Sequence, residues 1–363
     1  MSTVEFSFDS LSSAAQSMSP AAIPTGPNYK GFFKRALVNL LIIVFMFGFV
    51  ELYNICFGQG NGLIGLTIAL AIISFYRIDI GIKPLQGALV IFFVFLLTGA
   101  STFLSSFHPL LGLVINCSSI YTILTLTSHQ PMTKPYYPIL SCYLFAQGSP
   151  VYGIDYGFRM LGIACGGLVV SIFYFIRHRN IQRKRGILDI FHETHFCSIR
   201  TKFFIRLTMG LTLAMLISDL FHAIRPAWIS FTVLSLVHPF VNESRKKIVY
   251  RIIGTIIGGI LFFILFEWII PQSWHPALLL LSGYIYLFLR TYWIQQIFVT
   301  LSSLSGAMVF LQADTAFELR ILFVLIGIGI VLFISLCAKL RLMDRIYGII
   351  QKIKTRNKKS SSI

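Results

Sequence analysis

Charged side chains are scarce in this sequence. Only 12% of its 363 residues are Asp, Glu, Lys or Arg, whereas 56% are hydrophobic. A soluble domain carries about 25% charged residues, so an ordinary soluble fold is excluded. Because apolar runs recur from about residue 36 to about residue 338, the sequence predicts an all-α integral membrane protein with many crossings rather than a soluble domain with one anchor.

The motifs that carry most enzyme chemistry are also missing. The six cysteines form no C-x-x-C pair, and the sequence has no Gly-rich phosphate loop, Walker motif or G-x-S-x-G elbow. His192 and His195 form an H-x-x-H pair, which differs from the H-E-x-x-H signature of zinc enzymes. We therefore expect no enzyme, no metal site and no cofactor.

Acidic residues are few as well: 13, against 30 Lys and Arg, which gives a formal net charge of +17. In a soluble protein such an excess would suggest nucleic acid as a partner. Here most basic residues stand in short loops and tails beside apolar runs, where membrane topology and anionic lipid headgroups account for them. The expected partner is therefore the lipid bilayer and not a nucleic acid.

Twelve apolar segments predict about twelve membrane-spanning helices. Their expected positions are about 36–55, 62–77, 84–103, 108–126, 137–152 and 157–176 in the first half, and 204–221, 226–241, 249–269, 276–290, 293–312 and 319–338 in the second. Several are shorter than the roughly 20 residues that a hydrocarbon core of about 30 Å requires. The second, fifth and eighth are therefore candidates for tilted, broken or re-entrant segments.

The chain divides into five parts on this basis. They are a disordered cytoplasmic tail (1–29), a first six-helix repeat (30–177), a basic cytoplasmic linker (178–202), a second six-helix repeat (203–338) and a basic cytoplasmic tail (339–363). With the N-terminus inside, the cytoplasmic loops hold nearly all Lys and Arg, and the outer loops hold only Arg225. Basic residues stay on the cytoplasmic side of a membrane, so both termini are predicted to be cytoplasmic.

Paired motifs indicate that the two halves are copies of one unit. Ser106-Phe107-His108-Pro109 matches Ser273-Trp274-His275-Pro276, and Gly87 precedes Gly254 by the same number of residues. Arg159-Met-Leu likewise matches Arg320-Ile-Leu. Because six crossings is an even number, the copies have the same orientation and a pseudo-two-fold axis along the membrane normal. A transport pathway is expected at the interface between them.

Arg159 and Arg320 are the sharpest candidates for a binding site. A charge within a membrane helix is costly and usually faces a partner or a water-filled path. A guanidinium binds a carboxylate in a bidentate way, so two such residues would suit an organic anion. The alternative is a structural lock, in which Arg159 pairs with Asp155 and Arg320 pairs with Glu318 or Asp314.

Other polar residues are candidates for proton coupling, for the pathway or for helix packing. The carboxylates and histidines that could carry protons are Glu51, Asp219, Asp155, Asp314, His108 and His275, with exposure at the membrane surface or helix capping as the alternative. Gln295 and Gln296 could line a path or bond between helices. The glycines expected to allow close helix packing are Gly87, Gly254, Gly258 and Gly259.

The second half resembles the fusaric acid resistance / aromatic acid exporter (FUSC-like) superfamily. The resemblance rests on the run Pro226-Ala-Trp-Ile-Ser-Phe-Thr, on Arg251-Ile-Ile-Gly-Thr-Ile-Ile-Gly-Gly after a basic turn, and on Arg320-Ile-Leu. In the first half, Pro84-Leu-Gln-Gly87 lacks the arginine and the threonine of this motif. The linker and tail are too short for the large cytoplasmic domains of longer family members, so the chain resembles a compact form.

This resemblance implies an exporter of aromatic or other hydrophobic carboxylates in a bacterial inner membrane, driven by the proton gradient. It adds Trp228 and Thr232 to the predicted substrate or pathway residues. A periplasmic adaptor of the membrane-fusion type and a second copy of the chain are candidate partners. Plant malate channels of the same broad superfamily place arginines along an anion path, so a passive organic-anion channel is the alternative. An intramembrane enzyme is a third, less favoured interpretation.

Overall fold

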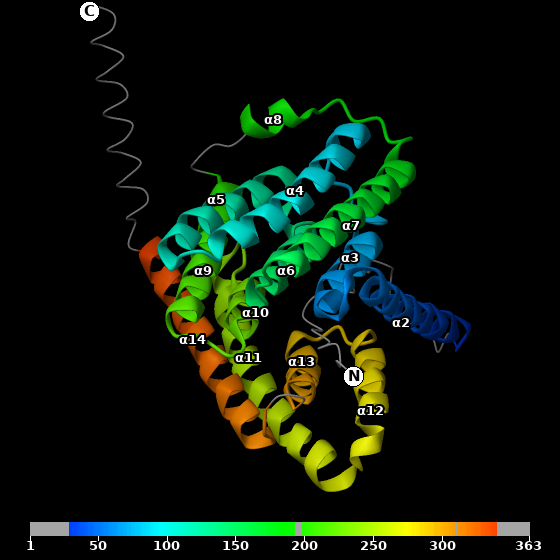
Figure 1. Ribbon diagram of the computed structural model, residues 1–363, viewed down its shortest axis with the longest axis vertical. Coiled ribbons are helices and arrows are strands. Elements are labelled where there is room, and N and C mark those ends of the chain that lie inside the picture. The colour runs from blue at the N-terminus through cyan, green and yellow to red at the C-terminus, as the bar shows by residue number, and fades with distance from the viewer. Residues whose placement is uncertain (1–28, 193–197, 309–310, 340–363) are drawn as a thin grey trace, which may run out of the picture.

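The computed structural model describes residues 29–192, 198–308 and 311–339, and within these ranges the chain is helical and has no strand (Figure 1). The tail expected at residues 1–29, except for its last residue, lies outside the described part of the chain. The same holds for His195 of the linker and for nearly all of the tail expected at 339–363.

A helix lies in each of the twelve segments expected from the sequence. In the first half these are α2 (Tyr29–Phe57), α3 (Gly62–Phe75), α4 (Pro84–Ser105), α5 (Pro109–Thr127), α6 (Tyr137–Gly148) and α7 (Ile154–His178). In the second half they are α9 (Ile199–Leu220), α10 (Pro226–Leu236), α11 (Val241–Phe262), α12 (His275–Tyr286), α13 (Tyr292–Ala307) and α14 (Ala313–Lys339). A short helix, α8 (Ile187–His192), lies in the linker, and a π-helical turn, Phe263–Ile269, extends α11.

Local sequence explains where several of these helices begin. Pro84, Pro109 and Pro226 each occupy the start of a helix, where the missing N–H costs no hydrogen bond. His108 caps α5, because its Nδ1 accepts a hydrogen bond of 3.2 Å from the backbone N–H of Leu110. Ser198 caps α9 in the same way by accepting from the N–H of Thr201 at 3.0 Å.

Seven of the described helices are long and apolar enough to cross a membrane, so the chain is a multi-pass membrane protein. They are α2, α4, α5, α7, α9, α11 with its π-helical extension, and α14. The helices in the second, fifth and eighth expected segments are shorter, with 14, 12 and 11 residues in α3, α6 and α10. At 1.5 Å per residue, α10 extends only about 16 Å, about half of the hydrocarbon core.

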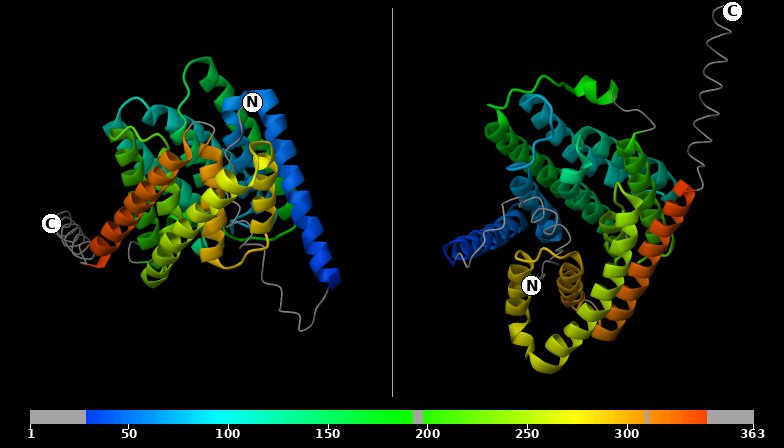
Figure 2. Two further views of the ribbon diagram at one scale, coloured as in Figure 1. Left: turned by 90° about the horizontal axis from the view of Figure 1, so that it is seen from below. Right: turned by 180° about the vertical axis from the view of Figure 1, so that it is seen from behind.

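These short helices form the centre of the molecule. Nearly every residue of α6 is buried, as are most residues of α3 and α10. The long helices surround them and carry most of the exposed large hydrophobic side chains, which is the arrangement expected where the solvent is lipid. Helix α2 lies at the edge of the molecule, in contact with α3, α7 and α12 (Figure 2).

Three of the contacts between the first six helices and the second six are the most relevant to the site. Helix α5 packs against α9, α12 packs against α2, and the central helices α6 and α10 lie side by side. In the α6–α10 contact the ring centroids of Phe145 and Phe231 are 4.8 Å apart. The functional residues described next lie around this central contact.

Candidate functional site

A cavity of about 100 Å³ lies where α6 meets α10. The first half contributes Leu63 of α3 and the end of α6 with Phe145, Gly148 and Ser149; the second half contributes Ile224 to Trp228, Phe231, Val299, Ser303 and Arg320. No Asp or Glu is among these described lining residues. We call this space the Trp228 cavity. It has aromatic walls and two arginines, Arg225 and Arg320, and it lies at the interface between the two halves.

Trp228 and Arg320 form the polar corner of this cavity. Trp228 is buried in the first turn of α10, and Arg320 is buried on α14 with only 2% of its surface exposed. The guanidinium carbon of Arg320 lies 5.1 Å from the centroid of the Trp228 ring. A cation over an indole face is attracted to its π electrons, so this contact holds the guanidinium beside the cavity. Phe323 packs against Trp228 in a T-shaped arrangement, at a centroid distance of 6.2 Å.

Arg159, the sequence counterpart of Arg320, has different surroundings. Its Nε donates to Oδ1 of Asn61 at 2.8 Å, and its Nη2 donates to the carbonyl of Gly60 at 3.2 Å. Its Nη1 donates to the carbonyl of Ala146 at 3.3 Å and also to that of Ser149. Arg159 thus ties α7 to the turn before α3 and to the end of α6. It does not line the Trp228 cavity, but it holds the backbone of Ser149, which does.

A second cavity, of about 80 Å³, lies at the other end of α10. Its lining includes Lys134 and Tyr137 from the first half, and Ser235, His238, Lys247, Tyr292 and Gln296 from the second. We call it the Lys134 cavity. The Nζ atom of Lys247 lies 5.4 Å from the ring centroid of Tyr292, and no acidic residue is among the described residues that line the cavity.

Burial shifts the pKa of two basic residues in the loops at this cavity, Lys134 and His238. Burial, with a smaller effect of the neighbouring Lys247 charge, lowers the pKa of Lys134 to about 7. Burial also lowers the pKa of His238 to about 4, with Lys247 and Lys134 acting in the same direction. The Lys134 amine therefore changes its charge near neutral pH, and an anion in the cavity would favour the charged form.

Arg251 lies between the two cavities and was not predicted as a site residue. It is fully buried; its Nη2 donates to Oγ1 of Thr232 at 3.3 Å, and its Nη1 donates to Oε1 of Gln296. Thr232 follows Phe231 of the Trp228 cavity along α10, and Gln296 lines the Lys134 cavity. The structure thus brings together the predicted residues Thr232 and Gln296, because both accept hydrogen bonds from Arg251.

Arg251 lies deeper in its helix than the sequence suggests, because the crossing was expected to begin only at about residue 249. Helix α11 begins at Val241, eight residues before the expected start of the crossing, so Arg251 lies well inside it. A signal for this was present in the sequence, because Arg251 follows Lys247 by four residues. On a helix that spacing places both side chains on one face, and here both face the interior.

The glycines expected to allow close packing lie against neighbouring helices. A Cβ atom on Gly254 would approach Gln296 to 2.5 Å, and one on Gly258 would approach the carbonyl oxygen of Ile297 to 2.7 Å. Gly259 faces the ring of Phe317, and a Cβ atom on Gly87 would approach the ring of Tyr174 to 2.7 Å. Helix α11 therefore packs closely on α13, which keeps Arg251 beside Gln296. Of the remaining pathway candidates, Gln295 is buried and its Nε2 donates to the carbonyl of Leu289 at 2.8 Å.

None of the six predicted proton-coupling residues lines either cavity. Glu51, Asp155, Asp314 and His108 are exposed, and Asp219 and His275 are half-buried. His108 serves as the cap of α5, which was the alternative interpretation, and Nε2 of His275 lies 3.1 Å from the carbonyl oxygen of Ile270. The structure does not bring these residues together, and their role in coupling stays a prediction.

The structure is that of a multi-pass membrane protein with buried polar groups. Long apolar helices surround a central pair of short helices, and buried cations lie between the two halves. Residues 213–334 match the family described as fusaric acid resistance protein-like, which supports the FUSC-like resemblance. The Trp228 and Arg251 motifs both fall within this range, and the family points to membrane transport related to fusaric acid resistance rather than to catalysis. No curated protein and no solved structure matches the chain.

Proposed function

We propose that the protein transports aromatic or other hydrophobic organic acids, and that the anion passes between the two halves along α10. The observation that carries this proposal is the Trp228–Arg320 pair in an aromatic cavity at their interface. The Arg320 guanidinium is suited to bind the carboxylate, and Trp228, Phe145 and Phe231 provide apolar surface for the ring. The volume of about 100 Å³ is smaller than the roughly 300–1,000 Å³ of most small-molecule sites, which argues against a peptide or a nucleotide and leaves room for about one small ring.

The succession of cations along α10 supports a path rather than a single binding site. Arg320 lies at the Trp228 cavity, Arg251 lies beside Thr232 in the middle, and Lys134 and Lys247 lie at the other end. Buried charges are costly in a membrane, and they are commonly found facing a substrate path. An anion moving along α10 would meet a positive group at each step. It would meet no carboxylate among the described residues that line the two cavities.

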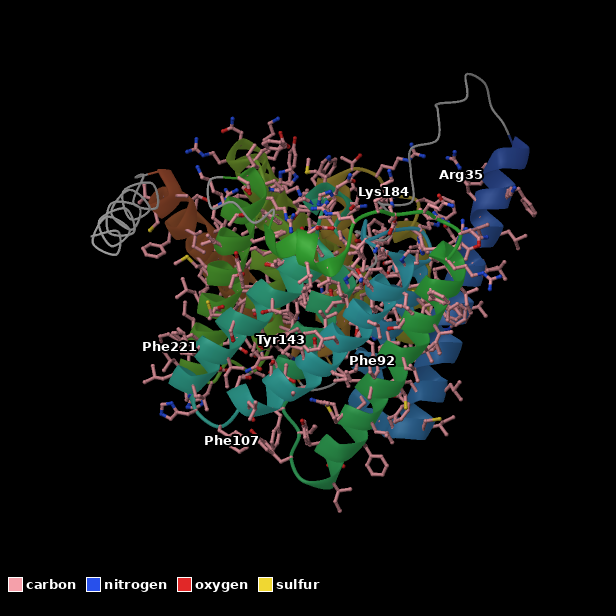
Figure 3. All side chains as sticks on the ribbon, turned by 90° about the horizontal axis from the view of Figure 1, so that it is seen from above. Arg35, Phe92, Phe107, Tyr143, Lys184 and Phe221 are labelled. Atoms are coloured by element: carbon pink, nitrogen blue, oxygen red, sulfur yellow. The ribbon has the colours of Figure 1, made fainter. Side chains whose placement is uncertain are left out.

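Two features support the proposed repeat and orientation. If the halves are equivalent, α2 corresponds to α9 and α5 corresponds to α12, so the α5–α9 and α12–α2 contacts form a symmetric pair. Figure 3 shows Arg35 and Lys184 at one end of the helices, Phe107 and Phe221 at the opposite end, and Tyr143 between them. We place the basic end, which carries the Lys134 cavity after α5, on the cytoplasmic side.

Export driven by the proton gradient of a bacterial inner membrane is the form of transport we favour. Asp219, half-buried near the end of α9, is the candidate carboxylate with the least exposure, and Glu51, Asp155 and Asp314 are alternatives. A membrane-fusion adaptor and a second copy of the chain remain the candidate partners. A passive organic-anion channel of the same architecture differs only in lacking the coupling.

The test is uptake into liposomes that contain the full chain, with labelled 4-hydroxybenzoate and labelled fusaric acid as substrates. With an imposed pH gradient, accumulation above the level that empty liposomes reach under the same gradient supports a coupled transporter. Flux that only equilibrates the two sides, with or without the gradient, supports the channel. Uptake equal to that of empty liposomes for both acids contradicts the proposed substrate class.

A further inference from the structure

A large cavity in the second half of the chain takes no part in the proposed path. It is a groove of about 850 Å³ bounded by α9, α11 and α14, all in the second half, and we call it the α14 groove. Figure 1 and Figure 2 show α11 running beside α14, whose later residues form one wall. The groove lies near the start of α9 and α11, which is the basic end of the molecule.

One side of the α14 groove is cationic. Lys202 and Arg206 lie one turn apart on α9, and Arg245 lies opposite them on α11. Arg206 is buried and fixed, because its Nη2 donates to the carbonyls of Pro239 at 2.7 Å and His238 at 3.2 Å. No Asp or Glu is among the described lining residues.

The other side of the α14 groove is apolar and open. Leu332 and Leu336 of α14 are 49% and 56% exposed, and Ile199 at the start of α9 is 61% exposed. With the buried Ile248 they make a continuous apolar wall that starts beside the cations and continues along the membrane-spanning helix α14. Within one groove, a phosphate group would contact the cationic side and a hydrocarbon chain would contact the apolar side.

We propose that the α14 groove binds an anionic phospholipid, with its phosphate at Lys202, Arg206 and Arg245 and an acyl chain along Leu332 and Leu336. Basic pockets between membrane helices recognise lipid headgroups through charge attraction in a poorly hydrated setting. A segment of the chain itself is a poor occupant, because the sequence after α14 is rich in Lys and Arg and would be repelled. The proposal is independent of the transported substrate.

The experiment measures binding of phosphatidylglycerol and phosphatidylcholine with equal acyl chains to the purified full chain by native mass spectrometry. We expect the wild type to prefer phosphatidylglycerol. In the Lys202→Gln/Arg245→Gln variant that preference should fall about fivefold for each cation removed. The matched control is Arg179→Gln/Lys184→Gln, which removes the same charge from exposed linker positions away from the groove. Its preference should stay within twofold of the wild type.

A second variant, Leu332→Ala/Leu336→Ala, keeps the cations and shortens the apolar wall. It should weaken binding of phosphatidylglycerol but not binding of glycerophosphoglycerol, which lacks acyl chains. Equal binding of the two phospholipids by the wild type would overturn the proposal, and so would equal losses in the groove and linker variants. Displacement of phosphatidylglycerol by inorganic phosphate at similar concentration would show an anion site without lipid recognition and would also overturn it.

Discussion

Replacing the two paired arginines one at a time should give two different defects. Arg320 faces the Trp228 cavity, whereas Arg159 makes its hydrogen bonds inside the first half. A hydrogen bond between a charged group and its partner contributes about 1.5–3 kcal/mol. If Arg320 binds the substrate carboxylate, Arg320→Gln should raise the apparent KM of transport by about 10- to 150-fold. It should have a smaller effect on stability, of the order of its cation–π contact with Trp228, which is worth about 2 kcal/mol at a buried site.

Arg159→Gln should have the opposite profile. The shorter, neutral side chain leaves the carbonyls of Ala146 and Ser149 without their donor. Each buried acceptor left unsatisfied costs about 1–3 kcal/mol, so the midpoint of thermal denaturation should fall clearly. The apparent KM of the protein that remains folded should change much less than in Arg320→Gln.

The assay combines initial uptake rates in liposomes over a range of substrate concentrations with thermal denaturation of the same preparations. Each arginine variant serves as the control for the other, because the substitution and the charge change are identical. If both variants lower stability equally and leave KM unchanged, Arg320 is a structural residue and the Trp228 cavity is not the binding site. A large KM effect in both would instead place Arg159 in the path.

Two further predictions concern charge and packing. The pKa of Lys134 is lowered to about 7 in the folded state, from about 10.5 in the unfolded chain. Below pH 7 the buried amine is charged, and this charge destabilises the folded state. Above pH 7 the folded protein releases the proton while the unfolded chain keeps it, so the destabilisation is lost as the pH rises. The free energy of unfolding should therefore rise between about pH 7 and 10.5, while anion binding at this cavity should weaken. The Lys134→Arg variant should show neither pH dependence. If the variant shows the same pH dependence of stability and of anion binding as the wild type, Lys134 is not the group responsible. Gly259→Ala should destabilise by about 1–3 kcal/mol because its Cβ meets Phe317, whereas Gly329→Ala, with open space around it, should not; equal denaturation midpoints would refute this packing.

The positions of the helices could be predicted because long apolar runs between basic or Pro/Gly-containing loops leave few alternatives in a membrane. The short α6 and α10 could be recognised as unusual from their length alone. Their burial at the centre could not, because it depends on how the two halves pack. Both helices are apolar on all sides, and a sequence with no polar face does not show which neighbour each one contacts.

The hydrogen-bond partners of the arginines could not be predicted for a related reason. Arg159 and Arg320 open similar motifs, but the partner that distinguishes Arg159 is Asn61, which lies far away in the sequence. Because the crossing was expected to begin at about residue 249, Arg251 was expected at its cytoplasmic end, where basic residues normally lie. Its burial is stabilised by Gln296 and Thr232 from two other helices, and neither contact leaves a local sequence pattern.

The central claim, passage of the anion between the halves, can be tested by linking them. A Cβ atom on Gly148 of α6 would lie 3.5 Å from the Cβ atom of Ala227 on α10, within the range of disulfide geometry, and both residues line the Trp228 cavity. The measurement is uptake of labelled 4-hydroxybenzoate by liposomes containing the Gly148→Cys/Ala227→Cys variant, before and after oxidation, with each single variant as a control. We predict that oxidation stops uptake in the double variant alone and that reduction restores it. Uptake at the wild-type rate by fully cross-linked protein would contradict a path between the halves.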